Sequence, residues 1–335
     1  MTRSWPSSGS AISGMTQSEP AGLIGSQITG LVFGAGLVVA AFATLEWRKR
    51  RSRAARDERP PQQAKILRPA GYWLTCRLNE LTEHFNSSLL QALAAGAVLG
   101  LVGTALFPVI EGLLLQRFSF AEIRGHPKSY IFLSGILVAL SALAWAIRSI
   151  IQAHQIDGNI RNYRLALRGE QAVAEALTDS ALAAAGYVAF HDVPGDGLWN
   201  VDHIVVGPGG IFVLETKARS RRKATRDQPD HEVWFDGQNL QFPWCNDREA
   251  AAQAERNARW VKHFTSGFAP KDIPVHPVVV IPGWYVKAQG NYLVKAMNAK
   301  YLVTDYLLPF KRHFSPQELQ TVVRRLDERC RDLEF

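Results

Sequence analysis

The chain has 335 residues, of which 47% are hydrophobic, so it is long enough to form more than one domain. Its three cysteines are odd in number and widely spaced, which excludes a disulfide framework and a Cys-x-x-Cys zinc site. The formal net charge is +8, and much of the surplus is concentrated in a few basic stretches, which points to an acidic partner such as nucleic acid or anionic lipid.

The N-terminal half contains three long apolar stretches. After a polar tail at 1–20, residues 21–45, 86–112 and 130–151 are composed mainly of apolar and small side chains. Each approaches the roughly 20 helical residues needed to cross a hydrocarbon core. We therefore predict an all-α transmembrane region of three helices, of which the third is the shortest.

Basic residues predict how these helices are oriented. The linker 46–85 is basic near its start, with the sequence "EWRKRRSRAARDER", whereas the tail before the first stretch contains only Arg3. The positive-inside rule places the N-terminus outside and the linker in the cytoplasm. The chain is then a multi-pass protein of the cell (inner) membrane with its C-terminal half in the cytoplasm. We also expect the basic residues within 47–68 to attract anionic lipid. Three basic residues in the outward loop 116–129 oppose this orientation.

The C-terminal half begins with a predicted helix, "RGEQAVAEALTDSALAAAGY". Val173, Ala174, Leu177 and Ala181 follow Glu170 at helical spacings, so Glu170 lies on the apolar stripe of this helix. A carboxylate on a buried stripe indicates a site, or else a favourable interaction with the helix dipole. The sequence "YVAFHDV" then predicts a strand.

Two apolar runs, Val201–Val206 and Ile211–Ala218, flank the turn sequence "GPGG" and predict a β-hairpin. Both of its faces are apolar, which is typical of strands covered on both sides. A hairpin that is symmetric about the centre of this turn pairs Asp202 with Glu215. Lys217 follows Glu215 by two residues and therefore projects from the same face.

Asp202, Glu215 and Lys217 should therefore meet at one end of an apolar face. Two carboxylates about 4 Å apart repel by roughly 4 kcal/mol at an effective dielectric near 20. Either one carboxylate binds a proton or a cation lies between them. Mg²⁺ suits such a site because it needs only one or two carboxylates and keeps several waters. The alternative is a structural ion pair at the end of the sheet.

Further elements are predicted downstream. Asn246 and Glu249 resemble a capping box at the start of a helix that carries Gln253 and Asn257 on a mainly apolar face. The amide of Gln253 should point to a site or to a buried hydrogen bond. "IPVHPVVVIPGW" and "YLVTDYLL" predict two more strands. "SPQE" at 315–318 predicts a capped terminal helix.

The order of helix with Glu170, strand, strand with Asp202 and strand with Glu-x-Lys resembles the PD-(D/E)xK nuclease superfamily. More closely, the chain resembles the nuclease-related domain, NERD, over about residues 160–285. The matching pieces are Gly169-Glu170, "NVDHIVVGPGGIFVLETK", Trp234 and "NDREAAAQAERNARW". The resemblance implies an α/β restriction-endonuclease-like core, a central mixed sheet flanked by helices, within a domain at 155–335.

The resemblance also implies roles for individual residues. Asp202 and Glu215 would bind Mg²⁺ or Mn²⁺ together with the backbone carbonyl of Thr216. Lys217 would be the catalytic lysine, and Glu170 would assist the metal shell.

Gln253 would be an accessory site residue, and DNA would be the substrate. The basic sequence "RSRRK" at 219–223 is either a contact to the phosphate backbone or a solvated loop. Three hypotheses remain open from the residues: a metal-dependent nuclease, a non-catalytic module of the same fold that binds DNA or protein at the membrane, and a salt-bridge cluster in an assembly domain.

Overall fold

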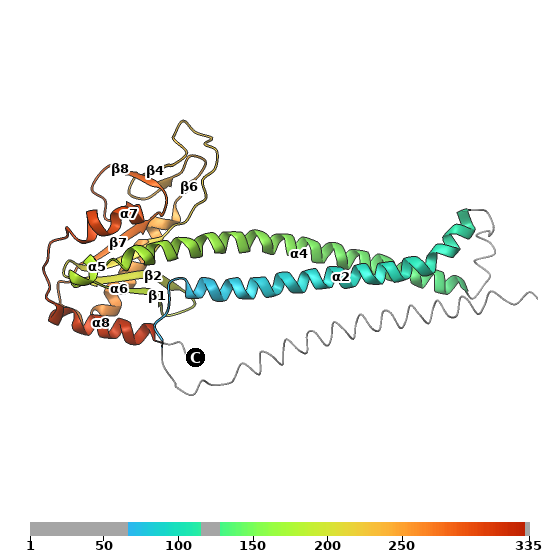
Figure 1. The fold of residues 1–335 in the computed structure, drawn as a ribbon, viewed down its shortest axis with the longest axis horizontal. Coiled ribbons are helices and arrows are strands. Elements are labelled where there is room, and N and C mark those ends of the chain that lie inside the picture. Colours follow the sequence, from blue (N-terminus) through green and yellow to red (C-terminus); the bar gives the residue numbers. More distant parts are fainter. Residues whose placement is uncertain (1–65, 115–127, 332–335) are drawn as a thin grey trace, which may run out of the picture. The chain divides into compact units, whose positions relative to one another are not determined.

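The computed structural model describes residues 66–114 and 128–331 of the chain (Figure 1). The predicted tail 1–20 and the predicted span 21–45 lie outside the described residues, as does most of the basic linker. The described residues divide into two compact units. The first unit holds 88–114 and 128–151, and the second holds 66–87 and 152–331.

Two long helices contain the other predicted spans. Helix α2 (Tyr72–Leu114) includes residues 86–112, and helix α4 (Lys128–Leu177) includes residues 130–151. Within the described residues, Tyr72–Leu106 and Leu133–Leu177 are long and apolar enough to cross a membrane. Their most apolar windows are only 11% and 17% buried, whereas the core helix of a soluble protein is mostly buried. Length and composition thus agree with two of the three predicted spans.

A five-stranded mixed sheet forms the centre of the second unit. Its strand order is β1-β2-β3-β7-β9, and the strands are β1 (Val188–Pro194), β2 (Asn200–Gly207), β3 (Gly210–Thr216), β7 (Val275–Val280) and β9 (Lys295–Met297). The first three strands are antiparallel, and β3, β7 and β9 are parallel. This arrangement fits the predicted α/β nuclease-like core.

A second, smaller sheet has the strand order β6-β5-β4-β8. It is built from β4 (Glu232–Phe235), β5 (Leu240–Gln241), β6 (Asn246–Asp247) and β8 (Tyr285–Ala288). Only β4 and β8 are parallel to each other. This sheet brings Asp247, at the end of β6, to the start of the next helix.

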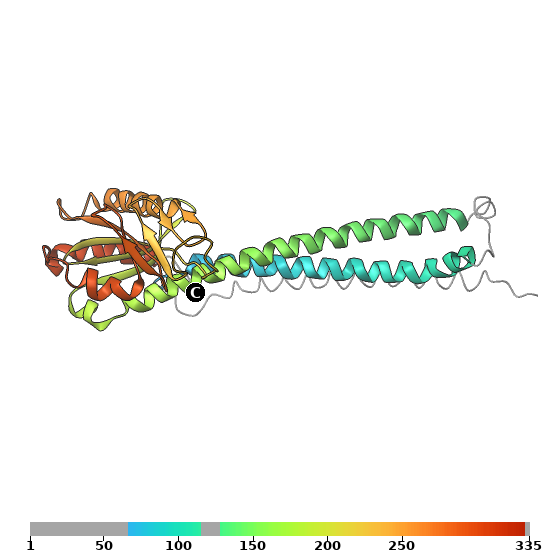
Figure 2. The same cartoon turned by 90° about the horizontal axis from the view of Figure 1, so that it is seen from above.

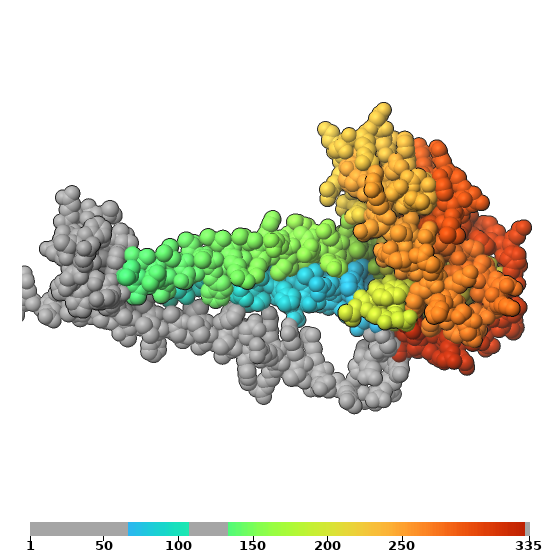
Figure 3. All heavy atoms as spheres, turned by 180° about the vertical axis from the view of Figure 1, so that it is seen from behind, coloured from blue at the N-terminus to red at the C-terminus, as the bar shows by residue number. Residues whose placement is uncertain are grey.

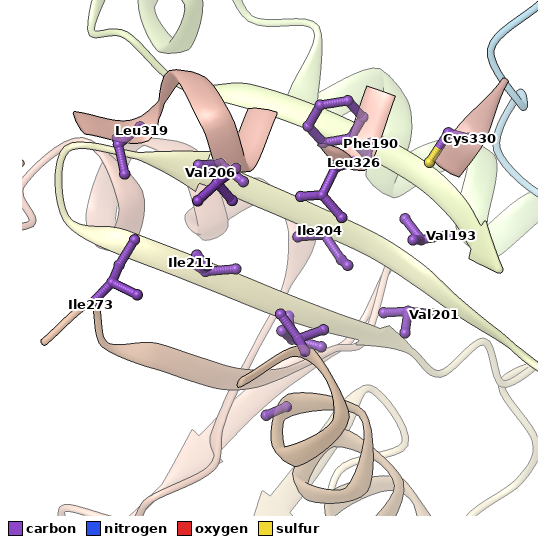
Figure 4. Packing of buried hydrophobic residues seen from close by; sticks show 14 residues of the cluster. Phe190, Val193, Val201, Ile204, Val206, Ile211, Ile273, Leu319, Leu326 and Cys330 are labelled. Carbon is purple, nitrogen blue, oxygen red and sulfur yellow. The ribbon is translucent and has the colours of Figure 1, made fainter. Parts of the chain in front are cut away.

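Helices cover both faces of the central sheet, as the two apolar faces of the hairpin predict (Figure 2). Ile204 and Val213 pack against α6 (Glu249–Thr265) and α8 (Pro316–Cys330), in the cluster shown in Figure 4. On the other face, Phe212 packs with residues of four helical elements. These are the end of α4, α5 (Ser180–Ala184), α7 (Ala299–Tyr301) and the π-helix η1 (Leu302–Leu307).

The register of the β2–β3 hairpin is the predicted one. Ile204 pairs with Val213 and Val206 with Ile211, so the loop has two residues, Pro208 and Gly209. Gly210 has a positive φ of 127°, and a Cβ at this position would lie 2.6 Å from the carbonyl oxygen of Pro274. Only glycine therefore fits the return of this turn beside β7.

Three local predictions are wrong. The sequence "YLVTDYLL" forms the end of α7 and η1 instead of a strand, because Asn298 caps this segment by accepting a hydrogen bond from the Lys300 amide. The helix expected from 168 to 187 is interrupted after Leu177, and Asp179 caps α5. The expected cap at Asn246 is replaced by Asp247, which accepts hydrogen bonds from the first amides of α6. By contrast, the predicted capping box at Ser315 is present.

Candidate active site

The predicted acidic pair lies at the open end of the β2–β3 hairpin, near the start of β2 and the end of β3. Asp202 is 8% exposed and Glu215 is 4% exposed, although neither is an apolar residue. The backbone amide of Thr216 donates a 2.7 Å hydrogen bond to Oδ2 of Asp202, which fixes the aspartate beside β3. Thr216 also has a buried hydroxyl without a hydrogen-bond partner among the described residues.

Glu170 reaches the same place from α4. A Cβ on the preceding residue, Gly169, would lie only 2.6 Å from Cβ of Ala218, so glycine lets α4 approach the end of β3 closely. Glu170 is buried, and its Oε2 atom has no hydrogen-bond partner in the described part of the chain. This contact gives a physical reason for the Gly-Glu pair.

The three carboxyl groups are buried and influence one another electrostatically. Burial and the neighbouring Asp202 and Asp192 raise the pKa of Glu170 to about 9. Burial raises the pKa of Asp202 to about 7, against the opposing effect of the Thr216 amide. The pKa of Glu215 is also raised well above its usual value, first by burial and then by Asp202. Each of the three carboxyl groups therefore binds a proton more readily than it would in water.

Lys217 lies at this cluster but forms its ion pair with a residue that the sequence does not single out. Its Nζ is 3.1 Å from Oδ2 of Asp247, and Arg219 donates to the same oxygen at 2.7 Å. Although burial opposes ionisation of Asp247, Lys217 and Arg219 hold its pKa below the usual value. Lys217 also opposes the raised pKa values of Asp202 and Glu215. It therefore lies within electrostatic reach of Asp202 and Glu215 as well as Asp247.

Helix α6 contributes an amide, but it comes from Asn257. The Asn257 Nδ2 group donates a 3.2 Å hydrogen bond to Oε2 of Glu215, and Asn257 is 4% exposed. Gln253 lies one helical turn before Asn257 and is partly exposed. Its side chain has no hydrogen bond among the described residues. Both belong to the face that the helical spacing predicts, and Asn257 is the one that reaches the carboxylates.

A segment far away in the sequence completes the acidic cluster. We call residues 68–73, at the start of α2, the α2 anchor segment. Asp192, fully buried with a left-handed φ of 49°, accepts hydrogen bonds from Nη1 of Arg68 at 2.9 Å and from the amide of Trp73 at 3.1 Å. The amide of Gly71 lowers the pKa of Glu170, against the larger effect of burial. The N-terminus of α2 thus presents positive charge to two of the buried carboxylates.

The basic sequence at 219–223 is partly bound to the protein. Arg219 contacts Asp247, and Arg221 donates a 2.9 Å hydrogen bond to the carbonyl of Gly283. Arg222 and Lys223 are exposed. Two of the four basic residues in this sequence are therefore tied to the fold.

The donor set suits a hard divalent cation. Asp202, Glu215 and Glu170 could supply carboxylate oxygens, and Oε2 of Glu170 is buried without a hydrogen-bond partner among the described residues. Among residues 66–114 and 128–331, no group of three or more His, Cys, Asp or Glu side chains is arranged to hold a metal ion. Mg²⁺ does not need such a group, because one or two carboxylates, a backbone carbonyl and waters satisfy it.

The comparison with protein families agrees with this geometry. Residues 166–282 match the nuclease-related domain, NERD. This NERD segment is about a third of the chain and contains Glu170, Asp202, Glu215 and Lys217. No curated protein and no solved structure matches the chain. The family match supports a nuclease-related function for this segment, close to the range 160–285 expected from the motifs.

The roles of several site residues have little or no signal in the local sequence. Asp247 lies in "CNDREA", where its neighbour Asn246 is the equally plausible cap, and Asn257 is one amide on a stripe with Gln253. Asp192 ends a strand-like sequence, and its partner Arg68 is 124 residues away. Arg68 also belongs to the stretch expected to bind lipid, so its charge pattern carries no signal of a buried partner. Only the folded arrangement identifies this pair.

Proposed function

We propose that this protein is a membrane-anchored nuclease that hydrolyses phosphodiester bonds of DNA with the help of Mg²⁺ or Mn²⁺. The observation that carries the proposal is the convergence of three buried carboxyl groups and Lys217 at one end of the central sheet, inside the NERD segment. Burying three acids together without a function is costly, and a cation would relieve that cost. The two apolar helices and the basic linker support a cytoplasmic domain tethered to the cell (inner) membrane, with anionic lipid at 47–68.

Each residue has a role in this proposal. Asp202 and Glu215 would hold the cation, with the Thr216 carbonyl, and Glu170 would complete the acidic shell. A bound Mg²⁺ would polarise the phosphate and make a coordinated water more acidic. Lys217 would position the attacking water and stabilise negative charge on the phosphate. Asn257 would orient Glu215, because its amide holds one carboxylate oxygen.

One observation favours a second candidate, a NERD-fold module that binds DNA or protein without cleaving it. Lys217 is paired with Asp247, which itself is fixed by two amides of α6. A lysine held in this way would have to leave or share its partner in order to act on a phosphate. Turnover distinguishes the two candidates.

The experiment uses the full chain in detergent or nanodiscs with supercoiled and linear DNA, in Mg²⁺, in Mn²⁺ and in chelator. We expect metal-dependent cleavage that Lys217→Ala and Asp202→Asn each reduce by at least about 100-fold, as loss of a principal electrostatic group does. Lys271→Ala, at an exposed position outside the site, is the matched control.

The outcomes separate the hypotheses. Cleavage that survives both site substitutions contradicts the proposed site. Absence of cleavage in the wild-type chain, with metal-dependent thermal stabilisation that Asp202→Asn removes, favours the binding module. Absence of both cleavage and metal binding leaves the salt-bridge cluster.

A further inference from the structure

The loop between β1 and β2 has an apolar tip that faces solvent. In residues 195–199, which we call the β1–β2 loop, Leu198 is 99% exposed and Trp199 is 39% exposed. The amide of Gly195 donates a 2.9 Å hydrogen bond to the carbonyl of Trp199 and closes the loop. Two large apolar side chains are therefore accessible on one short loop.

Arg329 of α8 binds the loop through several hydrogen bonds. The guanidinium donates hydrogen bonds to the carbonyls of Pro194 and Gly195 and to Oδ1 of Asp196. The other oxygen of Asp196 accepts a 2.7 Å hydrogen bond from the indole of Trp260. The exposure of Leu198 and Trp199 therefore belongs to a fixed loop conformation.

Aromatic rings continue from the loop onto α6. The ring of Trp199 lies against Gly195, where a Cβ would be only 2.3 Å away, and meets the ring of Trp260 edge-on at 5.2 Å. Trp260 is stacked on Phe264 at 5.3 Å, and Arg329 lies over both rings at 5.1 and 5.0 Å. We call Trp199, Trp260 and Phe264 the aromatic ledge. Figure 3 shows the loop (yellow) at the surface beside α6 (orange).

The aromatic ledge begins beside the candidate active site. Trp199 precedes Asp202 by three residues, and the intervening Asn200 donates a 2.8 Å hydrogen bond to Asp192. On α6, Trp260 is three residues after Asn257, which contacts Glu215. Trp260 is thus about one helical turn along α6 from the residue that contacts Glu215.

Basic residues also lie on the exposed surface of α6. Arg256 lies close enough to Glu215 to oppose its raised pKa, and it shares a helix face with Trp260 four residues later. Arg259 and Lys262 are exposed on other faces of the helix, and Arg259 is ion-paired with Glu255 at 3.5 Å. Arg256 therefore places positive charge beside the aromatic surface near the site.

We infer that the aromatic ledge and Arg256 bind unpaired nucleotides of a single DNA strand and lead that strand to the candidate active site. Base faces stack on aromatic rings largely independently of sequence, and basic residues track the phosphates. A continuous duplex hides its base faces, so the ledge would favour single-stranded tails, gaps or frayed ends. This inference rests on the proposed nuclease function and names its substrate class.

The test measures binding without cleavage. Full-length Lys217→Ala protein in nanodiscs, in chelator, is titrated into a labelled 20-nucleotide single strand and into the matching blunt duplex. We expect tighter binding of the single strand. Trp199→Ala should weaken that binding by about 5- to 100-fold, whereas Trp199→Phe should retain most of it. Leu293→Ala, which removes another exposed apolar side chain in the β8–β9 connection, should have no effect.

The outcomes are distinguishable from those of the nuclease test. Equal loss of single-strand and duplex binding in Trp199→Ala, or no loss of either, overturns the inference even if wild-type protein cleaves DNA. Selective loss of single-strand binding supports it even if no cleavage is found. A third measurement uses nanodiscs of brominated lipid without DNA. If brominated lipid quenches tryptophan fluorescence in the wild-type protein, and Trp199→Phe removes the quenched component, the tip faces lipid. That result would also overturn the inference.

Discussion

At the residue scale, one methyl group decides how closely α4 approaches the site. Gly169 has room only for hydrogen, because a Cβ would meet the backbone-fixed Cβ of Ala218 at 2.6 Å. Real Cβ atoms do not approach one another so closely, so α4 or the end of β3 would have to move. Glu170 follows immediately and would move with the helix.

Gly169→Ala should therefore destabilise the protein by about 1–3 kcal/mol and reduce metal-dependent cleavage. Ala218→Gly removes the opposing methyl, so the double variant should recover both properties. Gly158→Ala, on the same helix with open space around it, should be neutral or slightly stabilising. Thermal unfolding and DNA cleavage of the four proteins provide the measurement. Failure of Ala218→Gly to rescue would show that contact with Ala218 is not what requires the glycine.

At the element scale, the α2 anchor segment joins an apolar helix to the NERD segment. Asp192 has no exposed surface, and its side chain accepts hydrogen bonds from Arg68, the Trp73 amide and Asn200. A buried carboxylate that loses its cation keeps its desolvation cost. A fragment that begins at residue 152 would lack this segment altogether, although it would contain every residue of the family match.

Arg68→Met should destabilise the full chain by about 3–5 kcal/mol, because it removes a charged partner from a buried carboxylate. Asp192→Asn removes that charge while keeping the shape, so the double variant should be more stable than Arg68→Met alone. Arg77→Met removes an exposed ion pair with Glu80 and should change the melting temperature little. Melting temperatures in detergent measure all four. Equal effects of Arg68→Met and Arg77→Met would contradict a structural role for the buried pair.

Features that are set by neighbouring residues can be predicted from the sequence, whereas contacts between residues far apart in the sequence cannot. The hairpin register follows from local rules, since a two-residue turn and side-chain alternation leave one pairing for Ile204 and Val213. Helix starts depend on which of two neighbouring residues points back at the amides, so Asp247 replaced Asn246. The apolar sequence at 301–308 is so short that its length and periodicity do not distinguish a strand from a helix. Contacts such as Arg68 with Asp192 have no local signal at all.

At the scale of the whole molecule, this long-range contact constrains the membrane topology. Residues 66–87 and 152–331 belong to one compact unit, and Arg68 and Asp192 meet within it. The chain leaves this unit along α2 and returns along α4. If one of these helices crosses a membrane and the other does not, Arg68 and Asp192 lie on opposite sides. The contact therefore requires that both helices cross or that neither does.

The topology can be tested with the natural cysteines. Cys76 is exposed near the start of α2, whereas Cys330 is buried, so Cys245→Ser leaves one thiol open to a membrane-impermeant maleimide. If both helices cross and the positive-inside rule holds, Cys76 is labelled in inside-out vesicles and protected in right-side-out ones. A cysteine introduced at Ser119, between α2 and α4, should show the reverse pattern. Labelling of both positions from one side would mean that neither helix crosses.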